Sequence, residues 1–119
     1  MDAELKEKWV AALRSGDYPQ TRFALNRTKS HDEAPVGFCC LGVLCEVAGL
    51  PKEADYDNEF FVTYLMLDSN GEQTECAATL STEQAKIFGI EEVAPKLMDM
   101  NDSVGKNFDE IADWIEQHV

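Results

Sequence analysis

Two adjacent cysteines, Cys39 and Cys40, are the residues whose type and setting could most directly do chemistry. They stand at the start of an apolar stretch, residues 38–48, that we expect to form a buried helix. The unpaired N–H groups in the first turn of a helix favour a thiolate and can lower the pKa of a cysteine. This setting is typical of cysteine nucleophiles, and Gln20, further upstream, could donate a hydrogen bond to an oxyanion.

A cysteine nucleophile also needs a general base within hydrogen-bond reach, which is usually a histidine. The chain has two histidines, His31 in a polar segment before the apolar stretch and His118 next to the last residue. Papain-like enzymes place theirs on the strands that follow the helix, where this chain has none. Free cysteine is among the most buried residue types, so we favour core packing for both thiols. We assign no catalytic residue and keep Cys39, Cys40, Gln20 and His31 as candidates.

The C-terminal third contains a frame similar to a calcium-binding loop. Oxygen-bearing side chains occupy its first, third, fifth and twelfth positions: Asp99, Asn101, Ser103 and Glu110. The sixth position, where the sharp turn needs glycine, is Val104, so we expect no calcium site. The cysteines form no Cys-x-x-Cys pair, and no glycine-rich phosphate loop is present. We therefore expect neither metal nor cofactor.

The charge of the chain limits its partners. Its 119 residues include 23 acidic and 10 basic side chains, which give a formal net charge of −13. Since phosphate contacts need lysine and arginine, this charge argues against direct binding to nucleic acid or to an anionic membrane. It is compatible with a basic protein partner, although a merely solvated surface also explains it. The candidate binding residues lie in the C-terminal third: Asp99, Asp102, Asp109, Asp113 and Glu116.

The compartment follows from the cysteines and from the start of the chain. Three of the four cysteines share one apolar stretch, and no regular disulfide framework is visible, which indicates a reducing environment. The first residues show no basic region followed by an apolar run, and no apolar run reaches transmembrane length. We expect a cytosolic protein.

Hydrophobic spacing predicts the helices that would position these residues. Residues 2–15 predict an amphipathic helix with Trp9 and Leu13 on its inner face. In the central helix, Gly42 would let another backbone come close, and Gly49 would end the helix in a left-handed conformation. Two capping boxes predict helices in the last third, one formed by Ser81 and Gln84 and the other by Asn107 and Glu110.

The expected β-structure is small. Residues 60–67 and 73–80 predict a hairpin around a turn, and residues 21–26 a short strand. We expect residues 27–36 to be a polar surface loop and residues 52–59 to be irregular. Together the elements predict an α+β fold: a buried central helix, an amphipathic N-terminal helix, a small antiparallel sheet and a helical C-terminal third, in one compact domain over residues 1–119.

Three stretches together resemble a family of small proteins encoded by bacteriophages and some bacteria. They are residues 9–16 with Tyr18 and Gln20, residues 38–45 with the sequence Phe-Cys-Cys-Leu-Gly-Val-Leu-Cys, and Asn101 and Asp102 with residues 108–116. The resemblance implies a viral or prophage setting and a single compact domain, and it implies no catalytic role. The chain departs from the family pattern at Phe23 and Ala24, where we expect a link that contains glycine.

Three functions remain open at this point. The first is a non-enzymatic phage accessory protein that uses its acidic surface to bind a host or viral macromolecule. The second is a thiol-dependent hydrolase or transferase that uses Cys39 or Cys40. The third is a minor protein of the virion. We favour the first, because the chain is acidic and no complete catalytic set is visible.

Overall fold

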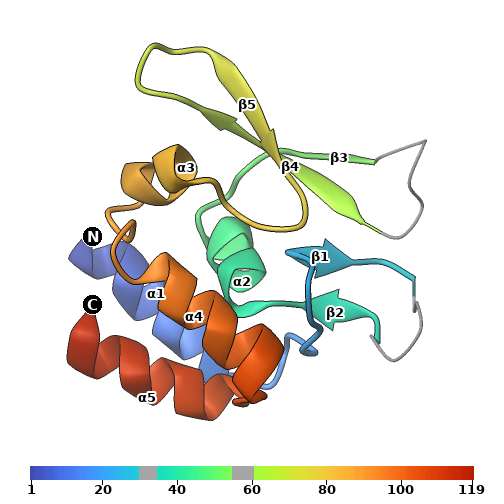
Figure 1. Ribbon diagram of the computed structural model, residues 1–119, viewed down its shortest axis with the longest axis vertical. Coiled ribbons are helices and arrows are strands. Elements are labelled where there is room, and N and C mark those ends of the chain that lie inside the picture. The colour runs from blue at the N-terminus through green and yellow to red at the C-terminus, as the bar shows by residue number, and fades with distance from the viewer. Residues whose placement is uncertain (30–34, 55–60) are drawn as a thin grey trace.

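The computed structural model shows an α+β fold with a layer of helices on one side and a three-stranded sheet on the other (Figure 1). It describes residues 1–29, 35–54 and 61–119. In these residues the helices are α1 (Ala3–Arg14), α2 (Cys40–Val47), α3 (Thr82–Ile87), α4 (Ala94–Asp99), the π-helix η1 (Met100–Val104) and α5 (Phe108–His118). The strands are β1 (Asn26–Arg27), β2 (Gly37–Phe38), β3 (Lys52–Ala54), β4 (Val62–Leu67) and β5 (Gln73–Cys76).

Helix α2 lies between the helical layer and the sheet, and its apolar sequence explains this position (Figure 1). Every residue from 40 to 45 is buried, as predicted. Gly42 also acts as predicted, because a Cβ atom there would lie 1.7 Å from the carbonyl oxygen of Leu25. The indole of Trp9 on α1 donates a hydrogen bond of 2.8 Å to the carbonyl of Cys40, which joins α1 to the start of α2.

The sheet is antiparallel in the order β3–β4–β5. The predicted hairpin is confirmed as β4 and β5, and its inner face buries Tyr64 and Met66. The prediction that residues 52–59 are irregular is wrong for Lys52–Ala54, which pair with β4. The remaining residues of that range lie outside the described part of the chain. The three residues of β3 carry too short a pattern for a strand to be predicted.

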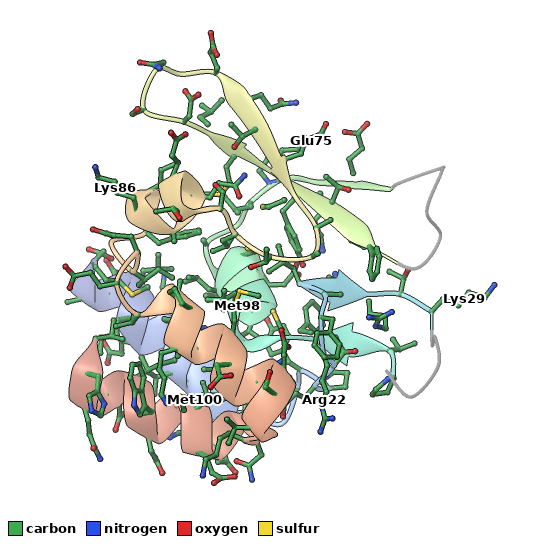
Figure 2. All side chains as sticks on the ribbon, viewed as in Figure 1. Arg22, Lys29, Glu75, Lys86, Met98 and Met100 are labelled. Carbon is green, nitrogen blue, oxygen red and sulfur yellow. The ribbon has the colours of Figure 1, made fainter. Side chains whose placement is uncertain are left out.

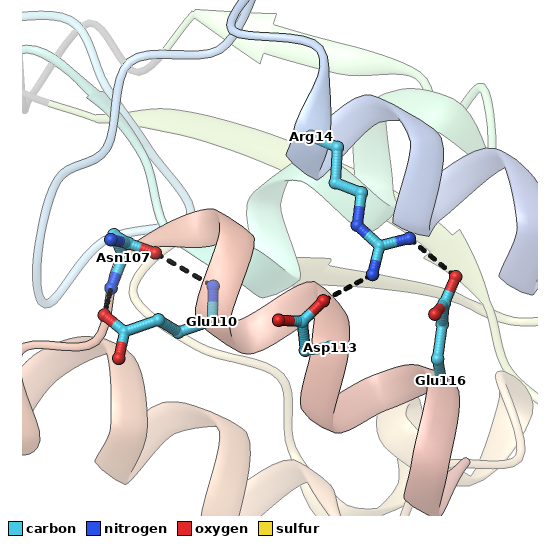
Figure 3. A network of polar contacts seen from close by, with 5 residues as sticks. All are labelled: Arg14, Asn107, Glu110, Asp113 and Glu116. Atoms are coloured by element: carbon cyan, nitrogen blue, oxygen red, sulfur yellow. Dashed lines mark hydrogen bonds and ion pairs between the residues drawn. The ribbon is translucent and has the colours of Figure 1, made fainter.

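Both capping boxes are present, and both helices begin where they were predicted. At α5, Asn107 Oδ1 accepts from the N–H of Glu110 at 2.8 Å, and the Glu110 side chain accepts from the N–H of Asn107 at 3.3 Å (Figure 3). These bonds satisfy donors that the first turn would otherwise leave free.

Residues 21–27 differ most from the expectation. Residues 22–25 form bends, and Phe23 has a left-handed backbone with φ of 61° and a side chain that is 60% exposed. This is the position where the family pattern led us to expect glycine, and glycine adopts such a φ without strain. The strand begins only at Asn26, and Arg27 is buried rather than part of a surface loop. Its guanidinium lies over the ring of Phe61, 5.0 Å from the ring centroid.

Candidate functional site

Asn101 is the buried centre of a polar network that joins three separate parts of the chain. Its Oδ1 accepts from Gln20 Nε2 at 2.9 Å and from the N–H of Cys40 at 3.3 Å. Its Nδ2 donates to the carbonyl of Thr21 at 2.9 Å and to Asp102 Oδ1 at 2.8 Å. Two accepted and two donated bonds use the full capacity of the amide. Asn101 therefore fixes the segment around Gln20, the start of α2 and η1 relative to one another.

A π-helical turn places Asn101 at this centre. Helix α4 continues into η1, whose wider turn carries both Met100 and Asn101 in buried positions. The turn ends at Gly105, which has φ of 78° and whose N–H bonds to the carbonyl of Met100. π-Turns of this kind often occur at functional sites in proteins. The sequence predicts helical turns in this region but gives no sign of the π-turn.

A second layer of hydrogen bonds supports the segment that carries Gln20. The amide of Gln20 also donates to the carbonyl of Lys106 at 2.8 Å. The hydroxyl of Thr21 donates to the carbonyl of Pro35 at 2.6 Å and accepts from Arg27 Nε at 3.2 Å. Buried Arg27 donates from Nη2 to the carbonyl of Arg22 at 3.0 Å. These bonds hold Thr21 and the bends of residues 22–25, where no regular ladder of backbone bonds does so.

A cleft of about 300 Å³ opens beside the network. Its lining includes Gln20, Thr21, Arg22, Asn101, Lys106 and Asn107. None of the described residues that line it is acidic, although acidic residues outnumber basic ones by 23 to 10 in the chain. This cleft is concave and polar, and the fully hydrogen-bonded amide of Asn101 supports its wall. For these reasons it is the candidate functional site in the described residues.

The two thiols do not face this cleft. Cys39 is the N-cap of α2, and its Sγ accepts from the N–H of Gly42 at 3.4 Å. The thiol of Cys40 donates to the carbonyl of Leu97 at 3.6 Å. Burial raises the pKa of Cys39 to about 12, despite opposing hydrogen bonds from backbone N–H groups. Burial also raises the pKa of Cys40 well above its ordinary value. The helix N-terminus therefore does not yield a thiolate here.

The other members of the possible catalytic set are placed as follows. Gln20 lies close to the start of α2 as a papain-like arrangement requires, but both of its N–H groups are bonded inside the network. His31 lies outside the described residues. His118 lies in the last turn of α5, where its ring stacks on Trp114 at a centroid distance of 4.4 Å.

The five predicted acidic residues lie in three places, and Asp99 is exposed at the end of α4. Asp109, Asp113 and Glu116 are exposed and share the outer face of α5, because they are four and three residues apart. Arg14 of α1 donates to Asp113 at 2.5 Å and to Glu116 at 2.6 Å (Figure 3). Asp102 is half-buried instead, where its Oδ1 accepts from the N–H of Phe23 at 3.1 Å and from the Asn101 amide.

The residues of the calcium-like frame do not form a binding loop. Asp99 ends α4, and Asn101 and Ser103 are in η1. The oxygen of Asn101 points into the network, while the Glu110 side chain accepts from the N–H of Asn107. In the residues that the structure describes, no three His, Cys, Asp or Glu side chains are arranged to hold a metal ion.

Comparison with protein families gives one result for the whole chain. The model of DUF8296, described as a domain of unknown function, matches residues 1–119. The chain belongs to the DUF8296 family. Comparisons with curated proteins and with solved structures gave no match.

In this DUF8296 chain, three separate stretches of the sequence meet at Asn101: residues 9–20, residues 38–45 and residues 101–116. Gln20 belongs to the first, Cys40 to the second and Asn101 with Asp102 to the third. The sequence indicates Gln20 as a possible oxyanion donor and Asn101 as a possible calcium ligand, but it does not indicate that they bond to each other. It does not indicate the cleft residues Arg22 and Lys106 as site residues either. The sequence does contain a signal for Arg22 and Lys106, since both are basic residues in an acidic DUF8296 chain. Within the described ranges, no helix has the length and apolar character needed to cross a bilayer.

Proposed function

We propose that the protein is a non-enzymatic phage accessory protein that binds a basic host or phage protein in the host cytosol. The observation that carries this proposal is the outer face of α5, where Asp109, Asp113 and Glu116 stand in one row. The side chains of Asp113 and Glu116 remain 66% and 51% exposed although Arg14 pairs with both. Two cations, Arg14 and the nearby Lys6, stand against three carboxylates and leave this row negative.

The surroundings of the row support a binding role. The opposite face of α5 buries Ile111 and Ile115 against the core, so the helix is a rigid support. Charges presented on a rigid element steer a complementary partner and speed its association, and salt weakens this effect.

The condition of the thiols argues against the enzymatic alternative. A cysteine nucleophile must be at least partly exposed and must ionise near the working pH. Cys39 and Cys40 are 4% and 0% exposed, and burial raises the pKa of both. Gln20, the candidate oxyanion donor, has no side-chain N–H group free for a substrate.

Charge neutralisation tests the binding proposal. The triple variant Asp109→Asn, Asp113→Asn, Glu116→Gln removes the row, and Glu72→Gln, Glu75→Gln, Glu83→Gln removes three exposed charges elsewhere. Tagged wild type should retain a basic protein from host lysate at low salt and release it at high salt. The control variant with substitutions at Glu72, Glu75 and Glu83 should also retain this protein, whereas the variant with substitutions at Asp109, Asp113 and Glu116 should not. Failure to recover a partner, or equal recovery by both variants, would contradict the proposal.

Cysteine alkylation against pH, read for each cysteine by mass spectrometry, tests the enzymatic alternative directly. We expect Cys39 and Cys40 to label only after denaturation, because both are buried. Rapid labelling of either in the folded protein below about pH 8, under the ordinary thiol pKa, would favour a thiol-dependent enzyme. Discovery of the chain in purified virions would instead favour the role of a minor virion protein.

A further inference from the structure

Among the described residues, the charged side chains that line the cleft beside Asn101 are basic, whereas the molecule as a whole is acidic. They are Arg22 and Lys106, and no carboxylate of the described residues lines the cleft. Arg27 lies buried next to it, bonded to Thr21 and to the carbonyl of Arg22. Its Nη1 atom is buried and has no hydrogen-bond partner among the described residues. Three of the ten basic residues thus gather at one site of a chain with net charge −13.

Among the arginines in the described residues, Arg22 is the one whose guanidinium forms no hydrogen bond or ion pair. Its exposed guanidinium extends along Gly105, since a Cβ built on Gly105 would lie 3.5 Å from Arg22 Nη2 (Figure 2). Lys106 is bound only loosely, because its Nζ is 3.4 Å from Glu110 Oε2 and its side chain is 44% exposed. The cleft therefore offers one free planar cation and one that a ligand can recruit.

The walls of the cleft are held in place before any ligand arrives. Gln20 donates to Asn101 on one side and to the carbonyl of Lys106 on the other. The amides of Gln20 and Asn101 are fully used as donors by these bonds, so they shape the cleft and offer it no free N–H group. Preorganised walls reduce the entropy lost on binding. The free donors are then the side chains of Arg22, Lys106 and Asn107, which lies at the N-terminal end of α5.

We infer that this cleft binds a small molecule through a carboxylate or phosphate group, with Arg22 as its principal contact. The guanidinium fork matches the paired oxygens of both groups. A volume of about 300 Å³ suits a small molecule and lies at the lower end of ligand pockets. This site is separate from the α5 row, because none of Asp109, Asp113 and Glu116 lines the cleft.

Titration of the full chain with inorganic phosphate or with succinate, at an ionic strength held constant with sodium chloride, tests the inference. NMR signals of the Arg22 side chain and of the Gly105 and Asn107 amides should shift and saturate. Tighter binding of phosphate would indicate a phosphate ligand, and tighter binding of succinate a carboxylate ligand.

The variant Arg22→Gln should weaken binding about tenfold or more, because it removes a charge-assisted hydrogen bond. It should still fold, because the side chain it replaces is exposed and unbonded. Lys86→Gln is the control, since Lys86 is exposed on α3 on another side of the molecule (Figure 2). The inference is overturned if the cleft signals do not saturate, or if Arg22→Gln binds as well as Lys86→Gln.

Discussion

Arg14 and Arg22 are both exposed arginines of an acidic protein, but their surroundings are opposite. Arg14 bridges α1 to α5 through Asp113 and Glu116, at 2.5 and 2.6 Å. Arg22 borders a cleft that is lined by no acidic residue in the part of the chain that the structure describes. The excess of acidic residues is therefore unevenly distributed. One region neutralises its cation within the chain, while the other leaves a cation available.

The two regions are also held together by different interactions. Behind Arg14, α1 and α5 pack through apolar side chains such as Leu13 and Ile115, and the ion pairs lie on the surface. Behind Arg22, Thr21 and the bends of residues 22–25 depend on hydrogen bonds to Asn101 and Arg27. We therefore expect single polar substitutions to disturb the cleft region strongly and the α1–α5 face weakly.

The variant Asn101→Ala should have the largest effect. It leaves the amide of Gln20, the N–H of Cys40 and the carbonyl of Thr21 without their partner in a buried setting. Each unsatisfied buried group costs about 1–3 kcal/mol, so we expect a loss of about 4 kcal/mol in the free energy of unfolding. Urea denaturation measures it, with Asn70→Ala in an exposed turn as the control. A loss as small as that of the control would show that the network does not hold the cleft region.

The variant Gly42→Ala should come next. Alanine favours a helix over glycine by about 1 kcal/mol, so propensity alone predicts that the variant is more stable. The new Cβ would lie 1.7 Å from the Leu25 carbonyl oxygen, however, and this backbone atom cannot move alone. We expect a net loss of about 3 kcal/mol, as for overpacked cores. Thermal unfolding shows whether the variant loses or gains stability relative to wild type. An increase in stability would exclude the close approach of Gly42 to the backbone of Leu25.

The variant Asn107→Ala should have a moderate effect, because this residue joins the two regions. It caps α5 and also lines the cleft. Loss of an N-cap side chain costs about 1 kcal/mol of stability. Asn107→Asp keeps the capping oxygen and serves as the control for stability, while its negative charge should weaken anion binding at the cleft. Equal stability of the alanine and aspartate variants would contradict the capping role.

Much of the fold could be predicted because its signals are local. The apolar stretch around Cys40, the glycine at position 42 and the two capping boxes each identify a helix or its contacts from a few neighbouring residues. The strand β3 could not be predicted, because its three residues pair with β4 by distant contacts. Buried Arg27 was missed for the same reason, since its partners Thr21 and Phe61 are brought to it by the fold.

Three residues of the network could be named from the sequence, but their arrangement and the cleft residues Arg22 and Lys106 could not. Gln20 and Cys40 are candidates for a cysteine-nucleophile site, and Asn101 is a candidate calcium ligand. Their actual relation depends on the π-turn that rotates Asn101 inward, and nothing in residues 99–104 indicates a π-turn rather than an α-turn. The acidic row on α5 could be predicted more easily, because helical periodicity alone places Asp109, Asp113 and Glu116 on one face.

The variant Arg14→Gln should have the smallest effect on stability and a clear effect on titration. Arg14 lowers the pKa of Glu116 through their side-chain hydrogen bond. A carboxyl whose pKa is lower when folded stabilises the protein above its unfolded pKa, and this contribution is lost as the pH falls through the folded pKa. In Arg14→Gln the pKa of Glu116 should rise, as followed by carboxyl NMR from pH 2 to 7, while the unfolding midpoint at neutral pH barely moves. The difference in stability from wild type should vanish once the pH is below the lowered pKa of Glu116, where the carboxyl is protonated in both proteins. If the pKa of Glu116 were unchanged, or if the Arg22→Gln variant shifted it as much, the contrast between the two arginines would be wrong.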